Sequence, residues 1–159
     1  MNLEEFKLND SNAEKQIITP PNKISKKVNL HSSTSIGELE KYLNQGYNLN
    51  SNLIEGNVDS KILFFFGKCH KQDQKILDNK SGELFDKMLS SIKLERSNVC
   101  LASYIPRGLE NLYDDEGFLT QIQMVNYRLI EIVNPKYLII MSNYCIKMLL
   151  ATDLSSISL

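Results

Sequence analysis

This sequence of 159 residues has almost no net charge, few cysteines and no long apolar run. With a formal charge of -1, no overall field draws the chain towards nucleic acid, so a DNA-binding surface would have to be a local basic patch. Cys69, Cys100 and Cys145 are odd in number and lack CxxC spacing, which argues against a disulfide framework and a metal site. We expect them to be free, buried thiols in a reducing compartment.

No apolar run approaches the roughly 18 residues of a membrane helix, and the first residues carry no apolar signal segment, so we expect a cytoplasmic protein with no membrane partner.

Two parts of the chain differ in composition. Residues 1–35 are polar, rich in Asn, Lys and Ser, and contain Pro20-Pro21, so they bury too little apolar surface to offset the entropy of ordering. The whole chain is 42% hydrophobic, which is enough for the core of one domain. We therefore predict a flexible leader at 1–35 and one domain at 36–159. Polar residues follow the last apolar segment, where another strand would begin, so we expect the domain to be incomplete at its carboxyl end.

The order of the apolar segments predicts a parallel α/β domain. Short, dense apolar runs at 61–67, 99–103 and 137–141 predict three buried strands. Apolar residues at helical spacing in 81–92, 118–133 and 144–151 predict three helices, and a shorter helix is expected from 35 to 45. The face of the helix at 81–92 is expected to pack on the sheet. Regular alternation of strands and helices is typical of a parallel sheet with right-handed crossovers.

Ligands of such sheets gather outside the carboxyl ends of the strands, so the loop at 67–75 is the first candidate site. Gly67 would let the backbone approach a ligand closely, although a glycine at a strand end also serves as a simple turn. Asp73 could orient a water molecule, or it could be a surface residue between Lys71 and Lys75. Arg107, in the loop after the second strand, could join the loop lysines in a phosphate clamp; the alternative is a solvated face.

Two further features have alternative interpretations. Tyr104 could stack on a base, but a tyrosine at a strand end is also a common packing residue. The acidic run at 114–116 lacks the context of metal ligands. Carboxylates favour the amino-terminal end of a helix, so we expect this run to begin the next helix.

Three segments together resemble the iron-sulfur type of uracil-DNA glycosylases, often called family four. They are KILFFFGKCHKQD, SGELFDKMLSSIKLERSNVCLASYIPR and VNPKYLIIMSNYCIKMLL. In that family a strand ends in a Gly-Glu-x-Pro-Gly loop, a Gly-x-Leu-Leu-Asp-x-Met-Leu helix follows, and a second strand ends before a Cys-Arg-Pro-Pro turn. A third strand containing Pro-Lys comes later. The similarity covers about 35–151 and implies a three-layer αβα domain with a central parallel sheet.

The sequence departs from the family's pattern at the positions that carry its chemistry. Lys68 stands at the place of the family's Glu, and Ser103 at the place of the Asn that reads the uracil edge. The stacking aromatic residue is replaced near Leu77, and the His-Pro motif is absent from the sequence. The positions expected for cluster cysteines hold Tyr47, then Ile105 or a gap, and Ile122. We therefore expect no iron-sulfur cluster, no other cofactor and no metal.

The resemblance implies a hydrolase of base-excision DNA repair that cleaves an N-glycosidic bond, with DNA as its partner. It places Asp73 as the catalytic residue, and Gly67 and Arg107 as substrate-binding residues. Because this chemistry needs a stacking pocket, base-edge hydrogen bonds and charge stabilisation, the substitutions predict impaired activity. A non-catalytic DNA-binding or protein-binding module is the alternative. With either function we expect a monomer. An unrelated doubly wound domain is the third interpretation.

Overall fold

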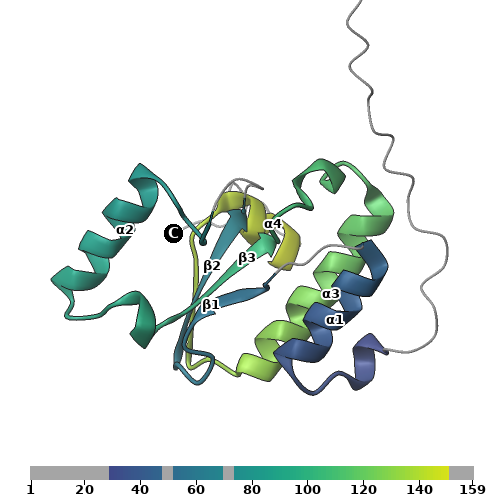
Figure 1. Ribbon diagram of the computed structural model, residues 1–159, viewed down its shortest axis with the longest axis horizontal. Helices are drawn as coiled ribbons and strands as arrows, with labels where there is room; N and C mark the ends of the chain where they lie inside the picture. The colour runs from purple at the N-terminus through teal and green to yellow at the C-terminus, as the bar shows by residue number, and fades with distance from the viewer. Residues whose placement is uncertain (1–28, 48–51, 70–73, 151–159) are drawn as a thin grey trace, which may run out of the picture.

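The structure is a computed structural model that describes residues 29–47, 52–69 and 74–150. Its sheet contains β1 (Ile54–Gly56), β2 (Ile62–Lys68), β3 (Cys100–Ile105) and β4 (Tyr137–Ile140) in the order β1-β3-β2-β4 (Figure 1). β2 pairs in parallel with both β3 and β4, and β1 pairs antiparallel with β3. The predicted α/β class and the three predicted parallel strands are confirmed.

The apolar run of β2 is buried on both faces of the sheet. Leu63 and Phe65 belong to one hydrophobic cluster, and Phe64 and Phe66 belong to another. Successive side chains of a strand point to opposite faces, so a central strand covered on both sides needs apolar residues at every position. This explains why β2 is a continuous apolar run.

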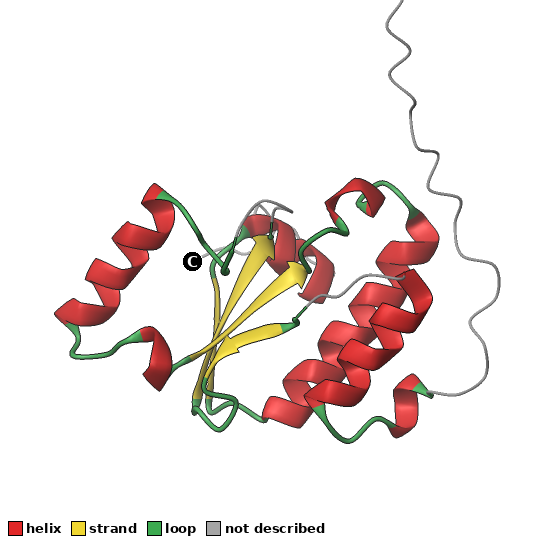
Figure 2. Ribbon diagram, in the orientation of Figure 1, coloured by secondary structure: helices red, strands yellow, loops and turns green. Residues whose placement is uncertain are grey.

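Helices cover both faces of the sheet, as Figure 2 shows. α1 (Ile36–Tyr47), α3 (Glu116–Val133) and α4 (Asn143–Leu150) supply residues to the cluster that contains Leu63 and Phe65. α2 (Lys80–Ser91) supplies Phe85 and Leu89 to the cluster on the opposite face. The fold is therefore a sheet between two helical layers.

The limits of α3 follow from residues that the sequence already singled out. The side chain of Asp115 accepts a hydrogen bond from the backbone N–H of Phe118 at 2.8 Å, which caps the helix and confirms that the acidic run begins it. At the other end, Asn134 adopts a left-handed conformation with φ of 46° and ends the helix before Pro135.

The sequence analysis missed β1 because that strand is only three residues long and contains Glu55 and Gly56. Gly56 has φ of +85°, and a Cβ atom there would overlap the carbonyl oxygen of Val99. Neither residue type favours a strand. The pairing with β3, rather than an apolar pattern, therefore defines this strand.

Two predictions about burial are wrong. β4 was expected to be a buried strand, but Tyr137, Leu138 and Ile139 are exposed, because β4 forms the edge of the sheet. The whole apolar face of α2 was expected to pack on the sheet. Phe85 and Leu89 do so, whereas Leu84, Met88 and Ile92 are exposed.

The described residues 29–33, inside the predicted leader, contact the domain. Leu30 is buried in the main cluster, and Nε of Arg128 on α3 donates to the carbonyl oxygen of Ser33 at 2.8 Å. Residues 1–28 lie outside the described part of the chain. In the described part, no helix has both the length and the apolar content to cross a bilayer.

All three cysteines are free and buried, as predicted. Burial raises the pKa of Cys100 to about 11 and that of Cys145 to about 12. Because the thiolate is the reactive form, we expect Cys100 and Cys145 to resist iodoacetamide at about pH 8 in the native protein and to react after unfolding. Peptide mass spectrometry after a timed reaction measures this, and rapid native labelling of either residue would contradict it.

Candidate functional site at the carboxyl edge of the sheet

The carboxyl ends of β2, β3 and β4 meet at one edge of the sheet, as parallel pairing requires. Lys68 pairs with Ile105 in the ladder, and the backbone N–H of Cys69 donates to the carbonyl oxygen of Ile105 at 3.1 Å. Met141, at the end of β4, donates its N–H to Phe65 of β2 at 2.8 Å. The loops that follow the three strands therefore begin side by side.

Gly67 faces the turn between β4 and α4. A Cβ atom at this position would lie 3.0 Å from Oγ of Ser142, which is tighter than an ordinary contact. Gly67 thus provides space for a neighbouring side chain of the fold. This is a packing reason for the glycine, and the predicted close approach of a ligand stays a prediction.

Lys68 stacks on aromatic rings at this edge. Its Nζ atom lies 3.3 Å from the centre of the Tyr113 ring and 6.0 Å from that of Tyr144. Such cation–π contacts fix a flexible ammonium group while leaving it hydrated on other sides. Tyr113 is 41% exposed, so part of its ring surface faces solvent. Lys68 is therefore a cation held against an aromatic ring that is partly open to solvent.

Arg107 holds the loop that precedes α2. Its Nη2 group donates to the carbonyl oxygen of Gln74 at 3.0 Å, while Lys75 beside it is exposed. Arg107 itself is half-buried, and its Nε group is buried without a hydrogen bond in the structure. The arginine thus joins the loops after β2 and β3. Asp73 and Lys71, the other predicted residues of this loop, lie outside the described residues.

Tyr104 is not placed to stack on a base. It has no exposed surface, and its ring makes edge contacts with Tyr144 at 5.6 Å and with Phe65 at 6.3 Å. Asn126 on α3 donates to its backbone carbonyl at 2.9 Å. Burial raises the pKa of the Tyr104 hydroxyl far above its usual value, and nearby Tyr144 and Cys145 raise it further. The packing interpretation of Tyr104 is the one that its burial supports.

Packed side chains occupy the positions that the family uses for cluster cysteines. Ile105 and Ile122 have no exposed surface and belong to the main hydrophobic cluster. Tyr47 packs edge-on against Phe118 and donates from its hydroxyl to Oε1 of Gln121 at 2.9 Å. Ser103, at the place of the family's Asn, is buried in β3. In residues 29–47, 52–69 and 74–150, no group of three or more His, Cys, Asp or Glu residues is arranged to hold a metal.

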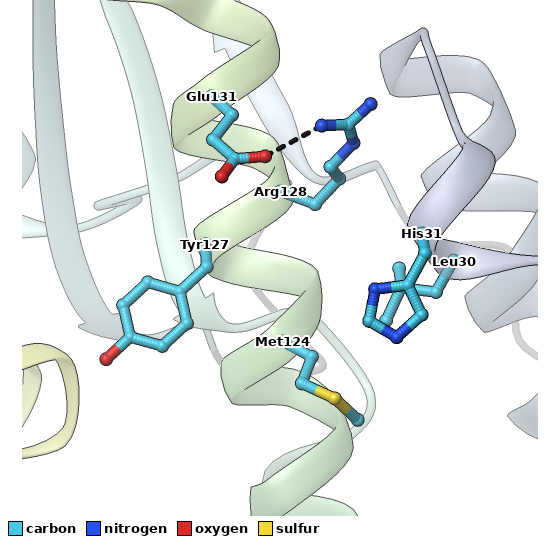
Figure 3. A pocket seen from close by; sticks show the side chains of 6 residues that line it. All are labelled: Leu30, His31, Met124, Tyr127, Arg128 and Glu131. Carbon is cyan, nitrogen blue, oxygen red and sulfur yellow. Dashed lines mark hydrogen bonds and ion pairs between the residues drawn. The ribbon is translucent and has the colours of Figure 1, made fainter.

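A hollow of about 210 Å³ lies on the outer surface of α3 (Figure 3). Leu30, His31, Met124, Tyr127, Arg128 and Glu131 line it. Its charged groups already have partners: Arg128 pairs with Glu131 at 2.7 Å and with the Ser33 carbonyl. Tyr127 points away from His31 in Figure 3 and donates to the carbonyl oxygen of Leu149. The volume is below the roughly 300 Å³ at which ligand pockets begin, which favours a packing groove.

Comparison with known proteins adds no family to these observations: no family model matches the chain, and no curated protein matches it. The functional proposal therefore depends on the residues at the carboxyl edge of the sheet.

Sequence reasoning missed Tyr113, Tyr144 and Ser142 as members of the carboxyl edge. Tyr113 lies in a stretch that is acidic and looks like a loop, and Tyr144 lies within the apolar pattern of α4. Ser142 is the second residue after β4. Its place after a predicted parallel strand was the one signal in the sequence that could have identified it.

Proposed function

We propose that this protein is a nucleic-acid-binding α/β module of uracil-DNA glycosylase ancestry whose base-excision activity is impaired. One observation carries the proposal: Lys68 and Arg107, from two neighbouring strand ends, share the carboxyl edge with the exposed ring of Tyr113. Cations bind phosphates, and an exposed aromatic ring can stack on a base. The proposal includes the finer fold assignment, which the parallel order of β3, β2 and β4 supports.

The geometry favours binding over excision for two reasons. An excision site needs a carboxylate that orients water, and the position of the family's Glu carries Lys68 instead. It also needs a pocket that receives a flipped base, and the buried Tyr104 and Ser103 are packed into the core. Contacts to phosphate and stacking on Tyr113 require neither feature.

Binding to a fluorescent single-stranded oligonucleotide at low salt tests the proposal. We expect Lys68→Ala to weaken binding about three-fold to ten-fold and to reduce the slope of log K against log salt by about one. Tyr113→Ala should weaken binding about five-fold or more, because stacking contributes about 1–3 kcal/mol per base. Fluorescence anisotropy over a salt series measures both effects.

Lys136→Ala is the matched control. Lys136 also lies near a tyrosine ring, with its Nζ 5.2 Å from the centre of Tyr137, but it precedes β4 and so stands at the amino edge of the sheet. The control should bind as the unmodified protein does. Equal losses for Lys68→Ala and Lys136→Ala would show that binding is diffuse and would overturn the assignment to the carboxyl edge.

The same preparation decides between impaired and active excision. Uracil-containing single and double strands are incubated with the protein and then treated with alkali, which cleaves any abasic site. We expect binding with little or no uracil-dependent cleavage. Efficient cleavage that disappears in Asp73→Asn would instead establish an active glycosylase with a rebuilt site.

A further inference from the structure

Among residues 29–47, 52–69 and 74–150, no strand pairs with the outer edge of β4. The N–H groups of Tyr137 and Met141 donate inward to Lys61 and Phe65 of β2. Inward and outward peptide groups alternate along a strand, so those of Leu138 and Ile140 point to the outer edge. A free edge of this kind is a template for pairing with another strand.

The edge carries none of the usual protections against pairing. Residues 137–141 read YLIIM, without a charge, a proline or a glycine, and no charged residue stands between Lys136 and Lys147. Exposed edges are normally kept apart by charged side chains, prolines or bulges. An apolar edge without them favours pairing with a strand of another chain.

An apolar stripe of α2 borders the same uncovered area. Asp86 of α2 pairs with Arg96, and Arg96 also pairs with Glu55 of β1. Because β1 forms the sheet edge opposite β4, Asp86 marks the side of α2 that faces β1. Each residue advances about 100° around a helix, so Leu84 and Asp86 lie on opposite sides of Phe85, which points to the sheet. The exposed stripe at 84, 88 and 92 therefore borders the β4 side of α2.

β4 contributes the neighbouring apolar residues. Ile139 pairs with Phe64 in the parallel ladder and so shares its face, which is the face that α2 covers. Tyr137 and Met141 lie on that face too, because strand side chains alternate. The surface, called here the β4–α2 surface, consists of Leu84, Met88, Ile92, Tyr137, Ile139 and Met141.

We propose that the β4–α2 surface binds a second copy of this chain by antiparallel pairing of the two β4 strands about a twofold axis. With the peptide groups of Leu138 and Ile140 outward, Leu138 of one copy bonds with Ile140 of the other. Ile139 then faces Ile139 across the axis, and Tyr137 faces Met141. Each strand supplies the donors, acceptors and apolar side chains that the other lacks, which is the self-complementarity of a twofold interface.

The exposed apolar area and the net charge of the chain both agree with a second copy as the partner. The six residues of this surface are 38% to 62% exposed. If about half of each large apolar side chain is exposed, these residues offer roughly 500 Å² per copy, against roughly 800 Å² per partner in a standard interface. Peptide groups and flanking side chains supply the remainder. With a net charge of -1, two copies repel each other very little.

Sedimentation equilibrium on the full chain tests the proposal. We expect a mass twice that of one chain, falling to one chain in Ile139→Lys, where two ammonium groups would meet at the axis. Met124→Lys is the control, since Met124 and Ile139 are both 38% exposed and Met124 lies on α3, on the other side of the sheet. A monomeric unmodified protein, or a dimer that Ile139→Lys leaves intact, would overturn the proposal.

A cysteine variant keeps the test decisive if Ile139→Lys does not fold. Directly opposed residues of a pair without hydrogen bonds are about 4.5 Å apart at Cα, which a disulfide can span. We expect Ile139→Cys to form a covalent dimer under mild oxidation and Met124→Cys to remain a single chain. Absence of the covalent dimer in Ile139→Cys would contradict the twofold register.

Discussion

Gly82→Ala is expected to lower the free energy of unfolding by about 3 kcal/mol or more, the upper range for overpacking a buried site. Gly82 is buried in the first turn of α2, and a Cβ atom there would overlap the carbonyl oxygen of Leu77. Leu77 has a positive φ of 56°, so its peptide is already held in an unusual conformation. The clash is with backbone, which cannot rotate away as a side chain does. Urea unfolding followed by circular dichroism measures the loss.

Gly37→Ala is a matched control, because Gly37 also lies in the first turn of a helix. Nothing stands within 4 Å of a Cβ atom at that position of α1. Alanine favours a helix over glycine by about 0.8–1.0 kcal/mol, so this variant should be unchanged or slightly more stable. Similar losses at both positions would show that the Leu77 carbonyl is not what makes Gly82 necessary.

In α2, the apolar spacing predicts the helix but not which of its residues are buried. The spacing of Leu84, Phe85, Met88, Leu89 and Ile92 predicted the helix correctly. It also predicted one buried face, whereas burial divides that stripe, because α2 covers only part of its side of the sheet. Periodicity reports which residues share a face. It does not report whether another layer covers that face.

The same limit explains β4 and the candidate site. The apolar run at 137–141 predicted a strand, but its exposure depends on its place at the sheet edge, which the order β1-β3-β2-β4 determines. Parallel strands indicated which loops meet, so Gly67 and Arg107 were placed at the same edge. The stacking of Lys68 on Tyr113 joins residues 45 positions apart. No local pattern in the sequence encodes such a contact.

Arg96 connects α2, β1 and the segment that precedes α2. Its Nε group pairs with Asp86 of α2 at 2.6 Å, and its Nη1 group pairs with Glu55 of β1 at 3.1 Å. The same guanidinium donates to the carbonyl oxygens of Ile76 at 2.6 Å and Leu77 at 3.2 Å. A planar fork of donors can satisfy all four acceptors at once, and a lysine ammonium cannot.

Arg96→Ala is therefore expected to lower the free energy of unfolding by about 3 kcal/mol, in the range for removing one partner from a buried pair. The Arg96 side chain is only 15% exposed, and its loss leaves Glu55 and two carbonyl oxygens without their shared donor. Arg96→Lys should recover only part of the loss. Urea unfolding at two salt concentrations measures this, and the loss should change little with salt because partly buried pairs are weakly screened.

Glu131→Ala provides the comparison for a surface pair, because it removes the ion pair with Arg128 and leaves the bond from Arg128 to the Ser33 carbonyl in place. Arg128 contacts Glu131 one turn along α3, and the two side chains are 31% and 65% exposed. Exposed pairs contribute about 1 kcal/mol or less, so this variant should lose much less stability than Arg96→Ala. If Arg96→Ala and Glu131→Ala lost the same amount, burial would not be what makes the Arg96 pairs important. A small loss at Arg96 alone would instead mean that Phe85 and Leu89 hold α2 on the sheet without help from the ion pairs.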